Sequence, residues 1–530
     1  MIKLGSHIFT KVAAKSYYLS MIIRFMPEKT VTLKQNVSYN LQYQIRIIEK
    51  EEMLFNSVGF ALFFPVVFLL YWFVVKKNLT FQNLLLLIAS YFFYACWDWR
   101  FMFLLMFSTL LDYYTGWKMC ETKTQKMRKF WLLLSVIINL GFLGLFKYYN
   151  FFAESFADFL SVLGFAVHPT TIKVILPVGI SFYTFHGLSY VIDIYYKKIK
   201  AERNIITYAL FVSFFPLLVA GPIERATHLL PQIKQKRNFD YYKAVDGLRQ
   251  MLWGLFKKMV IADNCAMVTD TIFANSDEFS GSTLVLGALL FAFQIYCDFS
   301  GYSDIALGAA RLLGISLLRN FAFPYFSRDI AEFWRRWHIS LTTWFRDYLY
   351  IPLGGSRCGI WKQIRNTYII FLVSGFWHGA NWTFLVWGLL HATYFLPLLL
   401  TKNNRKNIEI VAFNRILPTL SDVLKITGTF ILTLFAWIFF RAESISHAFE
   451  YIGRIPQNLL SVPEMMPRRI FLIILLFFII VEWFGRREQY ALENIGCRWP
   501  KVIRWSFYYL IVALIVLYTG ISQEFIYFQF

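Results

Sequence analysis

Two histidines lie in parts of this chain where ionisable side chains are rare. His378 lies inside the longest uncharged stretch, residues 366–400, between Trp377 and Gly379. A polar ring in hydrocarbon needs a partner or a water-filled cavity, so an intramembrane ionisable residue is a functional candidate by default. His338 lies 40 residues earlier, in a segment rich in tryptophan and arginine. A neutral imidazole can take a proton from a hydroxyl group and give one to a leaving group near pH 7.

Glycines flank the first of these histidines. Gly375 and Gly379 lie three residues before and one residue after His378, and they permit a close backbone approach and a helix break. A lone buried histidine is more often a satisfied structural residue than a catalyst, but a second histidine in a chemically rich segment shifts that balance. His391 has no such surroundings, and we expect it to hydrogen-bond another helix.

The segment around His338 has a helical pattern. Trp334, Trp337, Leu341 and Trp344 step by three, four and three residues, which places them on one helical face. Tryptophan and arginine on one amphipathic helix suit a membrane interface. The pattern on its own therefore favours an interfacial anchor helix with His338 beside the tryptophan face.

Carboxylates and helix breakers mark two further segments. Asp298 and Asp304 directly follow an uncharged run, where a carboxylate is disfavoured unless it faces a polar cavity or a partner. Pairing with the arginines of the tryptophan-rich segment is a structural role, which we favour over a catalytic one. Residues 215–225 contain two prolines and a Gly-Pro pair, which predict a break near one membrane face or an ordinary helix-ending loop.

The elements that must position these side chains are membrane helices. The 530-residue chain is 58% hydrophobic and only 16% charged, whereas a soluble protein exposes far more charge. Several runs without Asp, Glu, Lys or Arg approach the roughly 20 residues that a spanning helix needs. These runs are residues 57–75, 79–97, 130–146, 279–297 and 505–523. The sequence predicts an all-α polytopic membrane protein with about 11–13 helices.

The net charge of +21 has an explanation that requires no nucleic acid. Its lysines and arginines lie between apolar segments, as in the loops 118–129, 197–203 and 402–406, and such loops are typical of positive-inside topology. The six cysteines form no CxxC pair, so neither a zinc site nor a disulfide framework is indicated.

Residues 1–52 differ from the remainder of the chain. They are polar, mixed in charge and without a spanning run, whereas Met53 directly precedes the first apolar segment. We expect either that Met53 is the natural start or that residues 1–52 form a loosely ordered extension. Residues 53–530 are expected to form a single transmembrane domain.

The residues alone leave two reaction classes nearly even. No G-x-S-x-G elbow, H-E-x-x-H motif or GxxxxGK[ST] loop is present, so a covalent serine or zinc mechanism is not indicated. Membrane histidines, carboxylates and arginines suit base-assisted acyl transfer from a thioester to an alcohol, which requires no metal or redox cofactor. They equally suit a proton-coupled transporter, in which His and Asp relay protons.

Four strings together resemble the membrane-bound O-acyltransferase (MBOAT) family, in particular its bacterial alginate O-acetylase branch. They are FPLLVAGPIE (215–224), QIYCDFSGYSD (294–304), FWRRWHISLTTWFRDYLYIPLGG (333–355) and FWHG (376–379). Their order and spacing also match, and the resemblance runs from about Met53 to the C-terminus. The sequence departs mildly at Phe376, where many relatives carry leucine, and residues 1–52 have no counterpart.

The resemblance implies a ring of about 11–13 tilted transmembrane and re-entrant helices around a central tunnel. It implies that His378 is the general base midway through that tunnel and that His338 is the second site residue, which is His or Asn in relatives. Arginines would lie at the cytoplasmic interface, and aspartates would shape the cavity. The residues expected to line or support the tunnel are Asp298, Tyr302, Asp304, Trp334, Arg335, Arg336, Trp337, Arg346, Asp347, Trp377 and Asn381.

The sequence and the resemblance together predict an acyltransferase of the inner (cytoplasmic) membrane. It would move an acyl group, expected to be acetyl, from a cytoplasmic thioester such as acetyl-CoA or an acyl carrier for O-acetylation of an extracytoplasmic polysaccharide such as alginate. The expected partners are membrane lipid and an extracytoplasmic acetyltransferase, without a bound cofactor, metal or nucleic acid. The alternatives are D-alanyl transfer to teichoic acid or peptidoglycan O-acetylation on the same fold, a proton-coupled polysaccharide or lipid transporter, and a non-catalytic scaffold.

Overall fold

A computed structural model describes residues 53–165, 167–172, 175–219, 221–519 and 523–528 of the chain. Its contacts separate residues 1–60 from residues 61–530 as two compact units. The expectations for residues 1–52 fall outside the described residues, so they stay predictions, as does the single domain over 53–530. The packing and the sites described below lie within residues 61–530.

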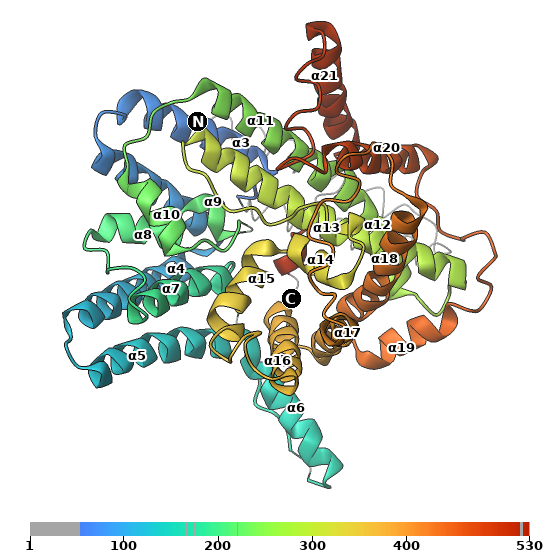
Figure 1. Ribbon diagram of the computed structural model, residues 1–530, viewed down its shortest axis with the longest axis horizontal. Coiled ribbons are helices and arrows are strands. Elements are labelled where there is room, and N and C mark those ends of the chain that lie inside the picture. Colours follow the sequence, from blue (N-terminus) through green and yellow to red (C-terminus); the bar gives the residue numbers. More distant parts are fainter. Residues whose placement is uncertain (1–52, 166, 173–174, 220, 520–522, 529–530) are drawn as a thin grey trace, which may run out of the picture. The chain divides into compact units, whose positions relative to one another are not determined.

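The described residues are helical and contain no β-strand, which confirms the predicted all-α class (Figure 1). The helices of the first half are α3 (Val58–Leu69), α4 (Leu79–Glu121), α5 (Gln125–Leu143), α6 (Tyr149–Val162), α7 (Ile180–Tyr195), α8 (Ile205–Ser213), α9 (Phe215–Leu218), α10 (Ala226–Lys234), α11 (Tyr241–Leu255) and α12 (Asp263–Ala274). Those of the second half are α13 (Gly281–Leu312), α14 (Ile330–Arg336), α15 (Ile339–Phe345), α16 (Ile360–His378), α17 (Trp382–Leu400), α18 (Leu420–Arg441), α19 (Ile445–Arg454), α20 (Arg469–Gly485) and α21 (Lys501–Tyr518).

Six of the described helical segments are long and apolar enough to cross a membrane, so the chain is a multi-pass membrane protein. They are α4, the continuous segment Gln125–Val162, α13, α17, α18 and α21. The predicted 11–13 helices also counted shorter tilted and re-entrant ones, and Val58–Val74 is such a shorter apolar helix.

Helix α4 contains a sharp turn at its middle. Asp98 has non-helical φ and ψ of −158° and 111°. The Tyr91 side chain lies close to those of Thr109, eighteen residues later in the same helix, and of Ser213. A straight helix would separate residues 91 and 109 by about 27 Å. The two halves of α4 therefore fold back on each other at Asp98.

Helix α13 is the buried centre of this part of the molecule, because 83% of its most apolar 18-residue stretch is buried by other elements. It packs closely against α11 because glycines meet at the contact. A Cβ at Gly301 would lie 2.8 Å from the carbonyl oxygen of Gly254, and small residues are what allow membrane helices to approach this closely.

Helices α16 and α17 form a hairpin that ends at the conspicuous histidine. A Cβ at Gly375 would lie 2.2 Å from the Phe384 carbonyl oxygen, and one at Gly379 would lie 2.0 Å from the Phe384 ring. Helix α16 ends at His378, with Gly379 as its extended C-cap. The close approach and the break that the two glycines predict are confirmed.

The predicted tryptophan-faced helix is wrong in two respects. Its residues divide between α14 and α15, because His338 adopts a left-handed conformation with φ 43° and ψ 54° that ends one helix and begins the next. The side chains are also buried rather than interfacial, with Trp334 and Trp344 at 6% and 7% exposed and Trp337 at 0%. The spacing correctly indicated a shared environment, but that environment is the protein interior.

Candidate functional site

The side chains of His338 and His378 face each other inside a cage of aromatic rings. Their ring centroids are 6.5 Å apart, although they come from different helices. His378 also contacts Trp387 at 5.2 Å and Phe440 at 5.3 Å. His338 contacts Phe299 of α13 at 4.7 Å. Both histidines are buried, at 0% and 2% exposure, so a reaction between them would be shielded from bulk water.

Unsatisfied polar atoms are concentrated in this cage. Neither ring nitrogen of His338 or His378 has a hydrogen-bond partner in another described residue. The same holds for the indole N–H groups of Trp337 and Trp377 and for the buried hydroxyl of Tyr527. Buried polar groups are normally paired, and each exception needs an explanation. A polar substrate that entered the cage would provide the missing partners.

The backbone around His338 is fixed by a second chain segment. The Ala322 N–H donates to the Arg336 carbonyl at 2.9 Å, and the Ile339 N–H donates to the Asn320 carbonyl at 2.8 Å. These two bonds bracket the left-handed residue. A non-glycine residue in this conformation is strained and persists only where its surroundings hold it. The imidazole is therefore positioned by its own backbone.

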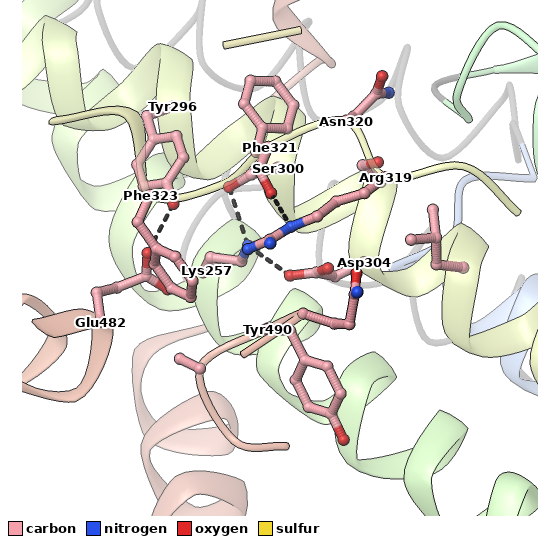
Figure 2. Close-up of a pocket in the computed structure, with 14 residues that line it drawn as sticks. Lys257, Tyr296, Ser300, Asp304, Arg319, Asn320, Phe321, Phe323, Glu482 and Tyr490 are labelled. Atoms are coloured by element: carbon pink, nitrogen blue, oxygen red, sulfur yellow. Dashed lines mark hydrogen bonds and ion pairs between the residues drawn. The ribbon is translucent and has the colours of Figure 1, made fainter. Parts of the chain in front are cut away.

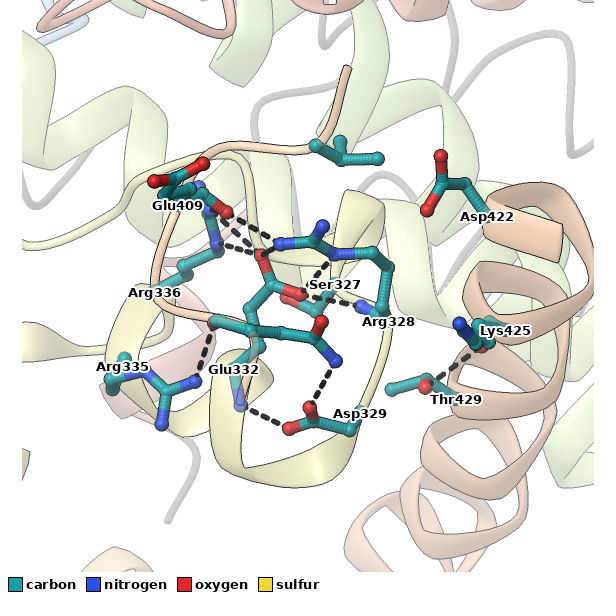
Figure 3. Close-up of polar contacts among 12 residues, drawn as sticks. Ser327, Arg328, Asp329, Glu332, Arg335, Arg336, Glu409, Asp422, Lys425 and Thr429 are labelled. Carbon is teal, nitrogen blue, oxygen red and sulfur yellow. Dashed lines mark hydrogen bonds and ion pairs between the residues drawn. The ribbon is translucent and has the colours of Figure 1, made fainter. Parts of the chain in front are cut away.

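An ion network stabilises α14, the helix that directly precedes His338 in the sequence (Figure 3). Glu332 is 1% exposed and pairs with Arg328 at 3.0 Å and with Arg336 at 2.8 Å. Arg335 donates to two backbone carbonyls of the 404–407 loop at 2.8 and 2.7 Å. The predicted pairing of these arginines with Asp298 and Asp304 is therefore wrong, because Glu332 and backbone carbonyls satisfy Arg335 and Arg336.

Asp298 instead anchors the C-terminal segment of the chain. One carboxylate oxygen lies 2.8 Å from the Lys258 ammonium, and the other accepts the Ile526 N–H at 2.7 Å. Lys258, 1% exposed, also pairs with Asp263 at 2.8 Å and donates to the Gln523 carbonyl at 3.0 Å. The C-terminal turn η7 (Ile526–Phe528) thereby lies among the central helices (Figure 1). The structural role favoured for Asp298 is observed, with a different partner.

This anchoring places Tyr527 beside both histidines. Its ring lies 5.5 Å from that of His378 and 6.4 Å from that of His338. Sequence reasoning missed Tyr527, because an isolated tyrosine near a C-terminus carries no motif and the contact spans 149 and 189 residues. A tyrosine hydroxyl close to a reacting carbonyl can donate a hydrogen bond to a developing oxyanion.

Replacement of Tyr527 by phenylalanine should lower the rate of acyl transfer by about 100-fold, the low end of the cost of losing one positioned donor. The ring and its packing are retained, so the amount of protein in the membrane should not change. Initial rates in membranes matched for protein content would measure this, with the exposed Tyr509→Phe as the control. An unchanged rate in Tyr527→Phe would mean that the hydroxyl takes no part.

Lys147 is a second functional candidate that the sequence did not reveal. It lies in the π-helical turn η3 (Gly144–Tyr148) between α5 and α6, and π-helical turns are frequent at functional sites. Its ammonium donates to the Trp377 carbonyl at 2.7 Å and to the His378 carbonyl at 3.0 Å. A cation at the C-terminal end of a helix stabilises its unpaired carbonyls. Lys147 is therefore a positioning residue for His378.

A small cavity opens beside this lysine. Lys147, Gly179 and Val219 line it together with Trp377 and Tyr527, two residues that contact the imidazoles. Its volume is about 60 Å³. This cavity lies at the N-terminal end of α7 and is separated from the imidazoles by the rings of Trp377 and Tyr527.

Replacement of Lys147 by methionine should lower kcat about tenfold, because the end of α16 loses its two charge-assisted hydrogen bonds. KM for the donor should change less, and Lys147→Arg should restore part of kcat. Steady-state kinetics on solubilised protein would separate the two constants. Lys129→Met, on the exposed surface of α5, is the matched control, and an equal loss in both variants would contradict the positioning role.

A second, polar cavity lies between α13 and the segment that carries Arg319 and Phe321 (Figure 2). Lys257, in the π-helical turn η4 (Phe256–Ala262), pairs with Asp304 at 2.6 Å and donates to Ser300 at 3.0 Å. The cavity is also lined by Arg319 and by Phe321, and the Phe321 ring lies 6.3 Å from His338. Asp304 therefore lines this polar cavity, and its contribution to the reaction stays a prediction.

The other predicted residues lie further from the imidazoles. Asn381 is the N-cap of α17 and accepts the Thr383 N–H at 3.0 Å. Tyr302 packs on Phe525 at 4.6 Å. The Asp347 carboxylate lies 2.8 Å from the Arg346 guanidinium and 3.6 Å from that of Arg225. His391 accepts from the Trp334 indole at 3.2 Å, which confirms its predicted bond to another helix.

Comparison with known proteins gives a consistent result. A model of the membrane-bound O-acyltransferase family matches residues 196–441, which contain both histidines. The probable alginate O-acetylase AlgI of Azotobacter vinelandii is 37% identical over 458 residues, 85% of this chain and 88% of the relative. The peptidoglycan O-acetyltransferase of Helicobacter pylori is 33% identical, over 92% and 99% of the two chains. The teichoic acid D-alanyltransferase of Streptococcus thermophilus is 31% identical, over 46% and 62%.

Proposed function

Because the chain belongs to the membrane-bound O-acyltransferase family, we propose that it transfers acetyl groups from a cytoplasmic thioester toward the hydroxyl groups of an extracytoplasmic polysaccharide. O-acyl transfer in a membrane is the activity of the family. The acetyl group, the thioester donor, the outward direction and the location in the inner membrane are parts of the proposal. The observation that carries it is the pair of buried imidazoles, whose four nitrogens have no hydrogen-bond partner in the described part of the chain.

His378 is assigned as the general base. A dry aromatic cage accommodates a neutral imidazole, and the free nitrogens can accept the proton of an acceptor hydroxyl. The hydroxyl oxygen then attacks the thioester carbonyl, a C–O bond forms, and the carbon–sulfur bond breaks. The thiolate leaves and takes the proton back, so the products are an ester and a free thiol. His338 would assist by orienting the donor carbonyl or by sharing the proton.

The two cavities suit a reaction between two substrates. The cavity beside Lys147 is lined by Trp377 and Tyr527, and the polar cavity is lined by Phe321 and Ser300, with no lining residue in common. Neither cavity is lined by an imidazole itself, but each has a lining residue whose ring contacts one: Trp377 and Tyr527 contact His378, and Phe321 contacts His338. We assign the donor and the acceptor to different cavities, which would keep the thioester away from water until the acceptor is bound.

Similarity favours acetyl over D-alanyl as the transferred group. The alginate and peptidoglycan O-acetyltransferases cover most of this chain, whereas the D-alanyltransferases cover about half of it. A polysaccharide acceptor, alginate or another exopolysaccharide, follows the more similar alginate O-acetylases. An extracytoplasmic acetyltransferase that completes the transfer is the expected partner.

Transfer of labelled acetyl groups tests the proposal. The protein would be reconstituted in vesicles that contain the polysaccharide in the lumen, with [14C]acetyl-CoA added outside. Label should appear on the polymer, with the expected partner supplied in the lumen, and ester hydrolysis should release it. If acetyl label is not transferred, but label is transferred from a carrier protein charged with [14C]D-alanine, D-alanyl transfer to teichoic acid is favoured instead. Polymer movement without label transfer would favour a transporter, and full function without either histidine would leave only a scaffold.

A further inference from the structure

A basic region lies at the end of the first apolar helix, remote in sequence from both histidines. Two adjoining cavities, of about 430 and 640 Å³, share Trp72, Lys236, Arg237, Asn238 and Phe239 as lining residues. They lie where the π-helical turn η2 (Leu70–Val74) meets the loop between α10 and α11. Neither cavity shares a lining residue with the two cavities beside the histidines.

The lining of these cavities is strongly positive. Its only acidic member among the described residues, Asp240, caps α11 by accepting the Tyr242 and Lys243 N–H groups at 2.9 and 3.1 Å. Arg311 is paired with Asp246. In the described part of the chain the four lysines of the lining form no ion pair and are exposed. The basic residues are Lys76, Lys77, Lys236, Arg237, Lys243 and Arg311.

Arg237 is the residue that points to a ligand. It is only 6% exposed, and its guanidinium bonds the Asn83 side chain through one nitrogen. Its Nε and one terminal nitrogen are buried without a hydrogen-bond partner among the described residues, and the guanidinium lies over the Tyr71 ring at 5.6 Å. Burial lowers the pKa of Arg237 from its ordinary value, as expected for a cation without a compensating anion. A planar guanidinium with free N–H groups matches the geometry of a phosphate.

The other wall of the region is apolar and continues onto a lipid-facing surface. Trp72 and Phe68 make edge contacts with the Phe239 ring at 5.5 and 6.1 Å. Leu69 and Phe73, on the same turn, are 53% and 70% exposed. In a chain that spans a membrane, such exposed apolar side chains at a helix end face acyl chains. The region therefore combines a basic surface that suits a phosphate with an apolar surface that suits an acyl chain.

We propose that this region is a binding site for the phosphate head group of an anionic phospholipid, with Arg237 as its buried contact and the lysines at its rim. Basic pockets between membrane helices bind such head groups. A soluble phosphate would use only the basic half of the region, whereas a phospholipid also covers the exposed face of Leu69 and Phe73. The bound lipid would tie the first apolar helix to the loop between α10 and α11.

Native mass spectrometry of the purified full-length protein tests this site. Phosphatidylglycerol should remain bound where phosphatidylcholine does not. Arg237→Gln should weaken phosphatidylglycerol binding about fivefold, the factor that corresponds to ~1 kcal/mol per basic residue near an anionic surface. Lys77→Gln combined with Lys236→Gln should weaken it by about 25-fold by the same arithmetic. Lys402→Gln with Lys406→Gln removes equal charge elsewhere and should change nothing.

The outcomes separate the possible ligands. Binding of phosphatidylglycerol that is unchanged in both test variants overturns the proposal. Displacement of the lipid by inorganic phosphate or by coenzyme A also overturns it, because the site would then belong to a soluble phosphate. If Arg237→Gln fails to accumulate because its bond to Asn83 is lost, the rim double variant decides alone. These measurements need no acyl transfer, so they can fail without affecting the proposed reaction.

Discussion

Replacement of His378 by alanine is expected to abolish acyl transfer, with a loss of at least about 100-fold and up to 10,000-fold, the range for a positioned general base. The reason is geometric: this imidazole ends α16 inside an aromatic cage, and neither of its nitrogens has another described partner. Protein should remain in the membrane, because the ring forms no hydrogen bond that the fold needs. Polymer-bound acetyl, normalised to the amount of membrane protein, is the measurement.

A second variant and a control keep this prediction decisive. His378→Gln retains much of the side-chain volume, so a loss of activity in that variant cannot be attributed to a cavity. His447→Ala removes a half-buried imidazole that lies near Ser276 at 3.3 Å, outside the cage, and should leave the rate unchanged. Full activity in either His378 variant would refute the assignment of the base.

The sequence was sufficient to predict the class of the molecule and one half of its site. Membrane-length uncharged runs predicted an all-helical membrane protein, since hydrocarbon leaves few alternatives for the backbone. His378 was identifiable because an imidazole within 35 uncharged residues is costly. Gly375 and Gly379 were interpretable for a similar reason: at a helix end with close packing, only glycine fits.

Partners that come from distant segments were not predictable. Lys147 contacts the His378 carbonyl across 231 residues, and Ile526 bonds Asp298 across 228. Nothing in the local pattern distinguishes these residues from other lysines at helix ends or from other C-terminal residues. The pairing of Asp298 was misassigned for the same reason. Many cations lie near the membrane boundary in this sequence, and only the packing of η4 against α13 selects Lys258.

The prediction of one continuous helix around His338 was wrong for a different reason. Periodicity assumes a continuous helix, and Trp334, Trp337 and Trp344 do share one buried environment. The break at His338 depends on a positive φ that two backbone hydrogen bonds impose from residues 320 and 322. A long-range constraint therefore determines the local conformation, which is typical of strained functional sites. The candidate site residue of the segment, His338, is also the residue at which the helical pattern is interrupted.

His338 should therefore respond to substitution through its backbone as well as through its ring. His338→Ala removes the imidazole and should lower acyl transfer by at least about 100-fold. The left-handed conformation costs roughly 1–2 kcal/mol for an ordinary residue, and alanine has no polar side chain to offset that cost. We therefore expect this variant to lose thermal stability too, and its activity alone would be ambiguous.

His338→Gly resolves the ambiguity, because glycine adopts φ 43° without strain. Both variants leave the same cavity beside Phe299, but only glycine relieves the backbone strain, so His338→Gly should unfold at a higher temperature than His338→Ala and yet transfer acyl groups as poorly. Asparagine also tolerates the left-handed conformation and supplies a side-chain amide, so His338→Asn should be stable and retain more activity than the glycine variant. Thermal unfolding and transfer rates of the three variants give the test. Full activity in His338→Gly would show that this residue shapes only the backbone and would leave His378 to act without it.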